Sequence, residues 1–299
     1  MRILITGANG LIGRDIIKYF SINDNYHIIA TSRGDKYIGK ENIKYIKADI
    51  SEQDFVEKII NEKIDIIIHC GAEINFDNHN FKLIKTNCEG MYNIVDLALK
   101  SKCKKIIYIS SIQVIGKPQN TLIKENIFAN PLTLYHTTKL FGEYYLKNFK
   151  AIKSIILRIS APISENMSDE KILKNFINKC LKNEDIVLYG QGKRKQNYID
   201  TFDIAQAIEK SIQVEETGVF NIAGLESISN LELAYLCKKI LNSNSKITFN
   251  GIQDLEEEDK WEIDISKAKE KLKFIPRILI KESIIKIKER EKNENIIYK

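Results

Sequence analysis

The chain alternates short β-branched runs with longer segments of helical period, and this alternation restricts the fold more than any other feature of the sequence. The short runs are residues 2–6, 27–32, 43–47, 64–69, 105–110 and 154–159, and the helical segments are residues 10–20, 52–62, 87–100 and 135–147. Residues 64–68 are almost continuously apolar, as in strands that helices cover on both faces. Parallel strands joined by crossover helices produce this pattern. We therefore expect an α/β fold with a doubly wound parallel sheet.

A glycine-rich turn, Thr6-Gly7-Ala8-Asn9-Gly10-Leu11-Ile12-Gly13, follows the first strand and opens the first helix. Glycines let the backbone approach a pyrophosphate closely, and a helix N-terminus offers it free N–H groups and the positive end of a dipole. Gly13 allows the helix to pack tightly on the strand. In this strand–turn–helix context the motif predicts a dinucleotide-phosphate site.

We therefore expect residues 1–160 to form a dinucleotide-binding domain and residues 161–299 to form mainly a smaller substrate-binding lobe. Beyond residue 159 the sequence has polar loops, helical segments at 169–181, 203–214 and 230–241, and short apolar runs at 186–189 and 218–223. The boundary is not sharp, because the segments near residues 200–225 have the pattern of a helix and a strand that pack back onto the first sheet. The last residues, 289–299, are highly charged, and we expect them to be frayed.

The end of the second strand carries Thr31-Ser32-Arg33, with no carboxylate before Asp35. In such folds an acidic side chain here binds the ribose 2′-hydroxyl of NAD, whereas an arginine accommodates the 2′-phosphate of NADP. We expect NAD or NADP as the cofactor, with Arg33 and the missing carboxylate slightly favouring NADP. Alternatively, Arg33 is a solvated loop cation, or it stacks on the adenine without distinguishing the two cofactors.

A tyrosine and a lysine lie four residues apart in Tyr135-His136-Thr137-Thr138-Lys139. On a helix this spacing places both side chains on one face. A cation close to a phenol favours phenolate, so we expect Lys139 to lower the pKa of Tyr135 toward the working pH of an acid–base catalyst. Ser111 ends the fifth strand, at the sheet edge where ligands of such folds bind. We expect Ser111 to hydrogen-bond the substrate oxygen while Tyr135 moves its proton.

Composition and charge exclude several classes of protein. The chain has 299 residues, of which 43% are hydrophobic, and a net charge of +6 with interleaved basic and acidic residues. Interleaved charge is typical of a solvated surface, so we expect no nucleic-acid partner. An apolar run follows Arg2 directly, and no apolar stretch approaches the length of a membrane span. We therefore expect no signal peptide, no membrane partner and a cytoplasmic protein. The five cysteines lack a C-x-x-C pair, so we expect reduced thiols and no metal site.

Taken together, these motifs resemble the extended short-chain dehydrogenase/reductases, also called the NAD-dependent epimerase/dehydratase family. The matching stretches are Thr6 to Gly13 (T-G-x-x-G-x-x-G), Asp49-Ile50, His69 to Ala72 (H-x-A-A), Asn87, Ser111 to Gly116, Tyr135 to Lys139 (Y-x-x-x-K), residues 190–203 and Asp264 to Ala268 (D-x-S-K-A). The resemblance covers nearly the whole chain. It implies a Rossmann fold, NAD or NADP as cofactor, a small-molecule substrate that is a nucleotide-sugar, and a homodimer formed through a helix pair.

The resemblance also assigns site residues. It implies that Ser111, Tyr135 and Lys139 are catalytic, with Lys139 also holding the nicotinamide ribose. The implied cofactor-binding residues are Gly7, Asn9, Gly10, Leu11, Ile12, Gly13, Ser32, Arg33, Asp49, Ile50, Cys70, Gly71, Ala72, Asn87, Tyr135, Lys139 and Pro162. The implied substrate-binding residues are Gln113, Arg194 and Gln196. For Asn87 a structural role, ordering a water or a backbone bend, is an equal alternative.

Two departures from the family pattern restrict the reaction. The 4,6-dehydratase branch has an Asp-Glu pair after the catalytic hydroxyl residue, whereas this chain has Ile112-Gln113, so we do not expect dehydration. Many nucleotide-sugar epimerases grip the diphosphate with two arginines. Here Gln196 occupies the first place, beside Arg194 and Lys195, and residues 250–259 contain no arginine. The charge clamp is therefore weakened or rebuilt.

We expect hydride transfer at a secondary alcohol of a nucleotide-activated sugar, and an epimerase ranks first. An NADPH-dependent ketosugar reductase, favoured by Arg33, is the alternative. A further alternative is a cofactor-sensing protein without catalysis, although binding alone needs no acid–base pair such as Tyr135 and Lys139.

Overall fold

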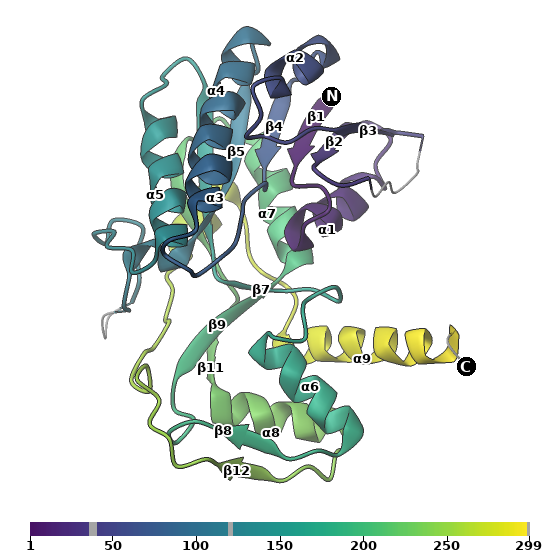
Figure 1. Ribbon diagram of the computed structural model, residues 1–299, viewed down its shortest axis with the longest axis vertical. Helices are drawn as coiled ribbons and strands as arrows, with labels where there is room; N and C mark the ends of the chain where they lie inside the picture. The colour runs from purple at the N-terminus through teal and green to yellow at the C-terminus, as the bar shows by residue number, and fades with distance from the viewer. Residues whose placement is uncertain (36–40, 119–121, 298–299) are drawn as a thin grey trace.

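A seven-stranded parallel sheet forms the first half of the molecule (Figure 1), in a computed structural model that describes residues 1–35, 41–118 and 122–297. In spatial order its strands are β10 (Gly218–Ile222), β6 (Lys153–Ile159), β5 (Lys105–Ser111), β4 (Ile66–His69), β1 (Arg2–Thr6), β2 (His27–Ser32) and β3 (Ile43–Lys47). This arrangement confirms the expected doubly wound α/β fold. The strand order reverses between β1 and β4, and such a switch point opens a crevice at the carboxyl ends of the strands.

The alternation of side chains along each strand explains how the sheet is covered on both faces. In β1, Ile3 and Ile5 belong to one buried cluster and Leu4 to the other, because successive side chains point to opposite faces. The first cluster lies under α1 (Leu11–Phe20) and α7 (Thr201–Gln213), and the second under α2 (Phe55–Ile59), α4 (Gly90–Lys100) and α5 (Leu134–Lys147). Figure 1 shows α4 and α5 on one side of the sheet and α1 and α7 on the other.

Two expected helices are interrupted. The segment 52–62 forms α2 and a 3₁₀ turn, η1 (Ile60–Glu62), which ends at Lys63 with φ 53°. The segment expected at 87–100 is α4 preceded by α3 (Phe81–Ile84) and a π-helical turn, η2 (Lys85–Glu89). Such π-helical turns often occur at functional sites, and η2 carries Asn87.

The second half of the chain builds a smaller lobe, drawn below the sheet in Figure 1. It contains a three-stranded sheet of β11 (Ser227–Ser229), β9 (Lys195–Asp200) and β7 (Ala161–Ile163), and a parallel pair, β12 (Ile247–Phe249) with β8 (Ile186–Leu188). The helices α6 (Ile172–Lys182) and α8 (Asn230–Leu241) pack on each other and share a separate apolar core.

Two elements of the second half lie on the first sheet. β10 pairs with β6 in parallel, and α7 packs against α1. The Thr201 hydroxyl at the start of α7 donates a hydrogen bond of 2.6 Å to Asp15 on α1. At the other end of α7, buried Lys105 donates to the carbonyls of Ser211 at 2.8 Å and Ile212 at 3.1 Å, which satisfies groups that a helix C-terminus leaves unpaired.

The segment 289–299, for which the charged sequence predicts fraying, is helical in its described part. The helix α9 (Ile280–Ile297) runs through residue 297, and residues 298–299 lie outside the described residues. Tertiary contacts hold α9, because Ser283 donates a hydrogen bond of 2.7 Å to Asp200 and buried Lys174 pairs with Glu291. Two further short elements are η3 (Ile112–Ile115) and η4 (Ala268–Leu272). In the described ranges, helices of the length and apolarity needed to cross a membrane do not occur.

Candidate active site

A cavity of about 730 Å³ opens between the carboxyl edge of the sheet and the smaller lobe. The glycine turn, the ends of β2, β4 and β5, the start of α5, and strands β7 and β9 all contribute to its walls. Every residue that the sequence assigns to the site lines this cavity, with the exception of Asn87. Residues far apart in the chain, such as Gly10, Tyr135 and Arg194, therefore face one space.

The glycine turn has the shape needed to hold a dinucleotide pyrophosphate. Gly7 has φ +69°, and a Cβ on it would lie 2.7 Å from the backbone of Gly71. A Cβ on Gly13 would lie 2.2 Å from the carbonyl oxygen of Gly7. At the helix start, Gly10 provides no side-chain hydrogen bond to the first N–H groups of α1. These groups are left for an anion, so the residues present fit the cofactor that the motif implies.

The end of β2 forms another part of the cavity wall. Asn9 donates a hydrogen bond of 2.7 Å to the Ser32 hydroxyl, and this hydroxyl also contacts the Tyr45 hydroxyl on β3. Arg33 lines the cavity and pairs with Glu73 at 3.2 Å. Asp35 forms its ion pair on the surface with Lys47 at 2.8 Å.

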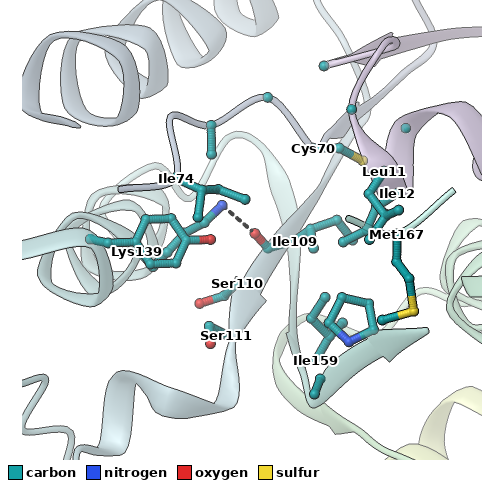
Figure 2. A pocket seen from close by; sticks show the side chains of 18 of the residues that line it. Leu11, Ile12, Cys70, Ile74, Ile109, Ser110, Ser111, Lys139, Ile159 and Met167 are labelled. Atoms are coloured by element: carbon teal, nitrogen blue, oxygen red, sulfur yellow. Dashed lines mark hydrogen bonds between the residues drawn. The ribbon is translucent and has the colours of Figure 1, made fainter. Parts of the chain in front are cut away.

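Three further predicted stretches form the walls beside the glycine turn. Asp49 accepts hydrogen bonds from the backbone and hydroxyl of Ser51, at 2.9 Å and 2.8 Å, and both Asp49 and Ile50 line the cavity. Cys70, Gly71 and Ala72 follow β4 directly, and Pro162 lies in β7. Figure 2 shows Cys70 close to Leu11 and Ile12.

Asn87 lies behind the cavity wall. It is buried, its amide oxygen accepts from the Glu73 backbone N–H at 2.8 Å, and its amide nitrogen donates to the Glu73 carbonyl at 3.0 Å and to the Thr138 hydroxyl at 2.8 Å. Asn87 therefore joins the loop after β4 to the helix that carries Tyr135. This geometry favours the structural alternative for Asn87 over contact with a cofactor.

The structure brings Ser111, Tyr135 and Lys139 together at one end of the cavity. Thr133 caps α5 by accepting a hydrogen bond of 3.2 Å from the backbone of His136, which fixes the start of the helix. Figure 2 shows Lys139 reaching over the end of β5, where its ammonium donates to the Ile109 carbonyl at 2.9 Å. Ser111 accepts a hydrogen bond of 3.2 Å from the backbone N–H of Gln113.

Burial controls the charge of this pair. It lowers the pKa of the Lys139 ammonium to about 8, partly opposed by the neighbouring Cys70 and Glu143. Burial raises the pKa of Tyr135. The expectation that Lys139 lowers the pKa of Tyr135 below its ordinary value is therefore wrong for this structure, because desolvation of the phenolate outweighs a cation whose Nζ lies 6.0 Å from the ring centre.

A buried ion pair that the sequence analysis missed lies near the end of the cavity that holds Ser111, Tyr135 and Lys139. Glu143 is fully buried and Arg158 on β6 is 4% exposed, and they are joined by Nη2–Oε2 and Nε–Oε1 contacts of 2.7 Å and 2.9 Å. The Ser110 hydroxyl donates to the same carboxylate at 2.6 Å. Glu143 follows Lys139 by one helical turn, as Lys139 follows Tyr135. This spacing in the sequence could have indicated that Glu143 lies on the same face of the helix.

The lobe side of the cavity holds the predicted substrate residues. Arg194 lines the cavity and pairs with Glu256 at 2.5 Å. Gln196 has a buried side-chain oxygen with no hydrogen-bond partner among the described residues. Residues on this side that the sequence analysis missed include Met167, Lys171, Tyr198 and Asn230. Figure 2 shows Met167 and Ile159 across the pocket from Lys139.

The loop after β4 adds two apolar residues that were also missed. Ile74 and Phe76 line the cavity, and the ring of Phe76 lies edge-on to Tyr135 with 6.0 Å between centroids. His136 lines the same end and bonds the Thr133 hydroxyl at 2.8 Å. Clusters of His, Cys, Asp and Glu suited to a metal ion are absent from the part of the chain that the structure describes.

Several known proteins are similar to this chain in sequence or in fold. A relative from Methanocaldococcus jannaschii, provisionally described as a UDP-glucose 4-epimerase, is 29% identical over 98% of this chain and 99% of its own length. The crystal structure of a UDP-glucose 4-epimerase from Thermotoga maritima with UDP-glucose has a TM-score of 0.88 at 21% identity, covering 98% of this chain and 99% of that chain. A UDP-glucuronic acid 4-epimerase from Bacillus cereus, in complex with UDP-glucuronic acid and NAD, has a TM-score of 0.83 at 23% identity over 95% and 96% of the two chains.

The sequence profile of one family spans most of the molecule. It matches residues 3–223, which include the glycine turn, Ser111, Tyr135 and Lys139. The chain belongs to the NAD dependent epimerase/dehydratase family.

Proposed function

We propose that the protein is an NAD(P)-dependent 4-epimerase of a nucleotide-activated sugar. The observation that carries the proposal is the convergence of Ser111, Tyr135 and Lys139 at the end of a cavity that begins at the glycine turn. The names of the relatives from Methanocaldococcus jannaschii and Thermotoga maritima indicate the 4-position of a UDP-linked sugar.

In this proposal the residues at the end of β5 and on α5 move a proton at the sugar. A bound nicotinamide coenzyme supplies a reversible hydride acceptor. As the phenolate, Tyr135 takes the proton of the sugar 4-hydroxyl and later returns it, and Ser111 hydrogen-bonds the same sugar oxygen. The positive charge of Lys139 favours phenolate and so opposes the effect of burial on Tyr135. In an epimerase the keto sugar turns in the cavity between the two proton transfers.

The coenzyme residues are proposed from the cavity wall. Gly7, Gly10, Leu11, Ile12 and Gly13 would hold the pyrophosphate, and Asn9, Ser32 and Arg33 the adenosine ribose. Asp49, Ile50, Cys70, Gly71, Ala72, Pro162 and Lys139 would complete the site, while Asn87 positions the wall from behind. A modest preference for NADP over NAD is supported by Arg33 at the cavity, although a 2′-phosphate would compete with Glu73 for its guanidinium.

Arg194, Gln196 and Gln113 are the proposed substrate residues. Arg194 would bind the diphosphate through charge-assisted hydrogen bonds, and its present partner Glu256 would have to share or release it. The unpaired oxygen of Gln196 suits a donor on the nucleotide or sugar.

A homodimer formed through α4 and α5 is part of the proposal. These helices carry outward apolar residues, of which Tyr92 is 58% exposed, Leu99 43% and Tyr144 56%, and a second copy would cover this face. Light scattering should give the mass of a dimer for the wild type and for Tyr235→Glu on α8, and that of a monomer for Tyr92→Glu combined with Tyr144→Glu. A monomeric wild type would contradict the dimer.

An NADPH-dependent ketosugar reductase is the second candidate, favoured by Arg33. Purified protein with UDP-glucose or UDP-galactose separates the alternatives. An epimerase interconverts the sugars with no net change in reduced nicotinamide, whereas a reductase consumes NADPH with a ketosugar in equal amounts. Cofactor binding without turnover of any sugar would contradict both.

A further inference from the structure

The catalytic end of the cavity has an apolar wall made by the loop after β4. Ile74 is 62% exposed and Phe76 58% exposed, although both line the cavity. The Phe76 ring is 6.0 Å from that of Tyr135 and 6.1 Å from that of His136. Figure 2 shows Ile74 beside Lys139, and Ser110 and Ser111 on the opposite side of Lys139. Large apolar side chains left open beside a catalytic group are available to a ligand.

Hydrogen bonds fix this wall relative to Tyr135. The Asn87 side chain bonds both the N–H and the carbonyl of Glu73, next to Ile74. Asn78, two residues beyond Phe76, accepts a hydrogen bond of 2.8 Å from the backbone of Leu134 at the start of α5. The wall is thus tied at both ends to elements that carry or support the catalytic residues.

The polar groups at this end are neutral or already engaged. Burial lowers the pKa of His136 to about 4, so its imidazole is uncharged near neutral pH. The Ser110 hydroxyl donates its proton to the Glu143 carboxylate at 2.6 Å, and Arg158 pairs with the same carboxylate, so both groups already have partners. Gln113 contributes only an amide to the lining.

The basic side chains that line the cavity lie in other parts of it or already have hydrogen-bond or ion-pair partners. Within the described residues the basic side chains that line it, histidine aside, are Arg33, Lys139, Lys171 and Arg194. Arg33 pairs with Glu73 at the end of β2, and Arg194 pairs with Glu256 in the lobe. Lys171 lies at the start of α6, and Lys139 donates to the Ile109 carbonyl. The Lys139 ammonium is the cation at this end, and in the proposed function it serves Tyr135 and the nicotinamide ribose. A carboxylate placed against Phe76 would therefore lose hydration without gaining a cation of its own.

We propose that the sugar accepted at this end is neutral, a hexose or N-acetylhexosamine, and that a hexuronate is rejected. The carbon–hydrogen face or acetamido methyl of the sugar would pack on Phe76 and Ile74, beside Tyr135. The inference rests on the proposed nucleotide-sugar function and selects a substrate class within it. Of the similar epimerases, the one from Thermotoga maritima has UDP-glucose in its structure and the one from Bacillus cereus has UDP-glucuronic acid.

A paired comparison of ligands tests the inference. With NAD present, calorimetry should give binding at least tenfold tighter for UDP-glucose or UDP-N-acetylglucosamine than for UDP-glucuronic acid, and kcat/KM should differ at least a hundredfold in the same direction. Equal or tighter binding of UDP-glucuronic acid would overturn the inference and leave the epimerase proposal standing. Binding of none of these ligands would overturn the proposed function, and the inference with it.

Variants of Phe76 test whether this wall determines the preference for a neutral sugar. Phe76→Arg places a cation at the wall and should shift the affinity ratio toward UDP-glucuronic acid by at least tenfold, whereas Phe76→Leu should preserve the wild-type ratio. Ile22→Arg adds the same charge at a side chain that is 75% exposed on the surface and should leave the ratio unchanged. An equal shift in Phe76→Arg and Ile22→Arg would mean that overall charge sets the ratio, which would contradict the proposed wall.

Discussion

The ammonium of Lys139 lies 6.0 Å from the centre of the Tyr135 ring and donates a 2.9 Å hydrogen bond to the carbonyl of Ile109. One helical turn of α5 thus places a cation and a phenol beside the end of β5. Because burial lowers the pKa of Lys139 to about 8, its charge is sensitive to pH in an accessible range.

This burial predicts a specific dependence of stability on pH. The pKa of Lys139 is about 8 in the folded protein, below its ordinary value of 10.5. Between these values the unfolded chain binds a proton that the folded chain lacks, so this group makes the free energy of unfolding rise with pH. The stability of Lys139→Met relative to wild type should therefore decline from pH 8 to 10.5, by up to about 1.4 kcal/mol per pH unit.

Urea unfolding of both proteins from pH 7 to about pH 10 measures this difference. Lys147→Met, which removes an exposed lysine from the same helix, is the control and should show no such decline. A difference between Lys139→Met and wild type that is constant across the range would contradict a buried ammonium.

His69 should make the protein sensitive to acid. It is buried, lies 2.7 Å from the Thr6 hydroxyl, and burial lowers its pKa from 6.5 to about 3. Below pH 6.5 the unfolded chain takes up a proton that folded His69 does not, so the free energy of unfolding falls as the pH falls toward 3. His69→Gln should reduce this slope by up to about 1.4 kcal/mol per pH unit.

Denaturant titrations between pH 7 and about pH 4 test the effect of His69. Exposed His79 offers a matched substitution, His79→Gln, which should keep the wild-type slope. Because burial also lowers the pKa of His136, some acid sensitivity should remain in His69→Gln. An unchanged slope in this variant would show that His69 does not stay neutral in the folded protein.

Arg194 should determine affinity for the nucleotide. Its guanidinium lines the cavity, and hydrogen bonds to a charged group contribute about 1.5–3 kcal/mol. Arg194→Gln should therefore weaken UDP binding by about ten- to a hundredfold, with a smaller effect on kcat than on KM. Lys193→Gln removes the same charge from the exposed neighbour and should leave binding within about twofold. Equal losses of UDP affinity in the two variants would indicate a general electrostatic effect and would contradict a direct contact between Arg194 and the nucleotide.

Glu143 and Arg158 should behave as a coupled pair. Removing one partner leaves a buried charge unpaired and costs about 3–5 kcal/mol, so Glu143→Met and Arg158→Met should each strongly destabilise the fold. The double variant should be more stable than the sum of the single effects predicts. Thermal unfolding of the wild type, the two single variants and the double variant completes this double-mutant cycle. Strictly additive changes in the free energy of unfolding would contradict a direct interaction between the buried charges.

The parallel sheet was predictable because β-branched runs between helical segments have a strong local signal. The strands β1, β2 and β3 begin and end where the sequence predicts. By contrast β7, β11 and β12 have three residues each, too few to establish a period of two. The helix α9 was missed because its charged sequence lacks a clear apolar stripe, and contacts such as Ser283 with Asp200 hold it.

The candidate site was predictable where backbone conformation or helical spacing requires particular residues. The glycine turn and the Tyr135–Lys139 spacing are of this kind. The pairing of Arg194 with Glu256 joins two loops, and the position of Phe76 beside Tyr135 depends on how the loop after β4 folds back. Neither contact has a signal in local sequence. The pKa of Tyr135 could not be predicted because burial depends on the whole fold.

The central claim is that the Tyr135 phenol moves the proton of the sugar hydroxyl, and Tyr135→Phe tests it most directly. The variant should bind NAD(P) and unfold at the same temperature as wild type, while kcat for sugar interconversion falls about 10²- to 10⁴-fold. Tyr235→Phe, at a side chain of α8 that is 58% exposed, should retain full activity. Wild-type turnover by Tyr135→Phe would contradict the account.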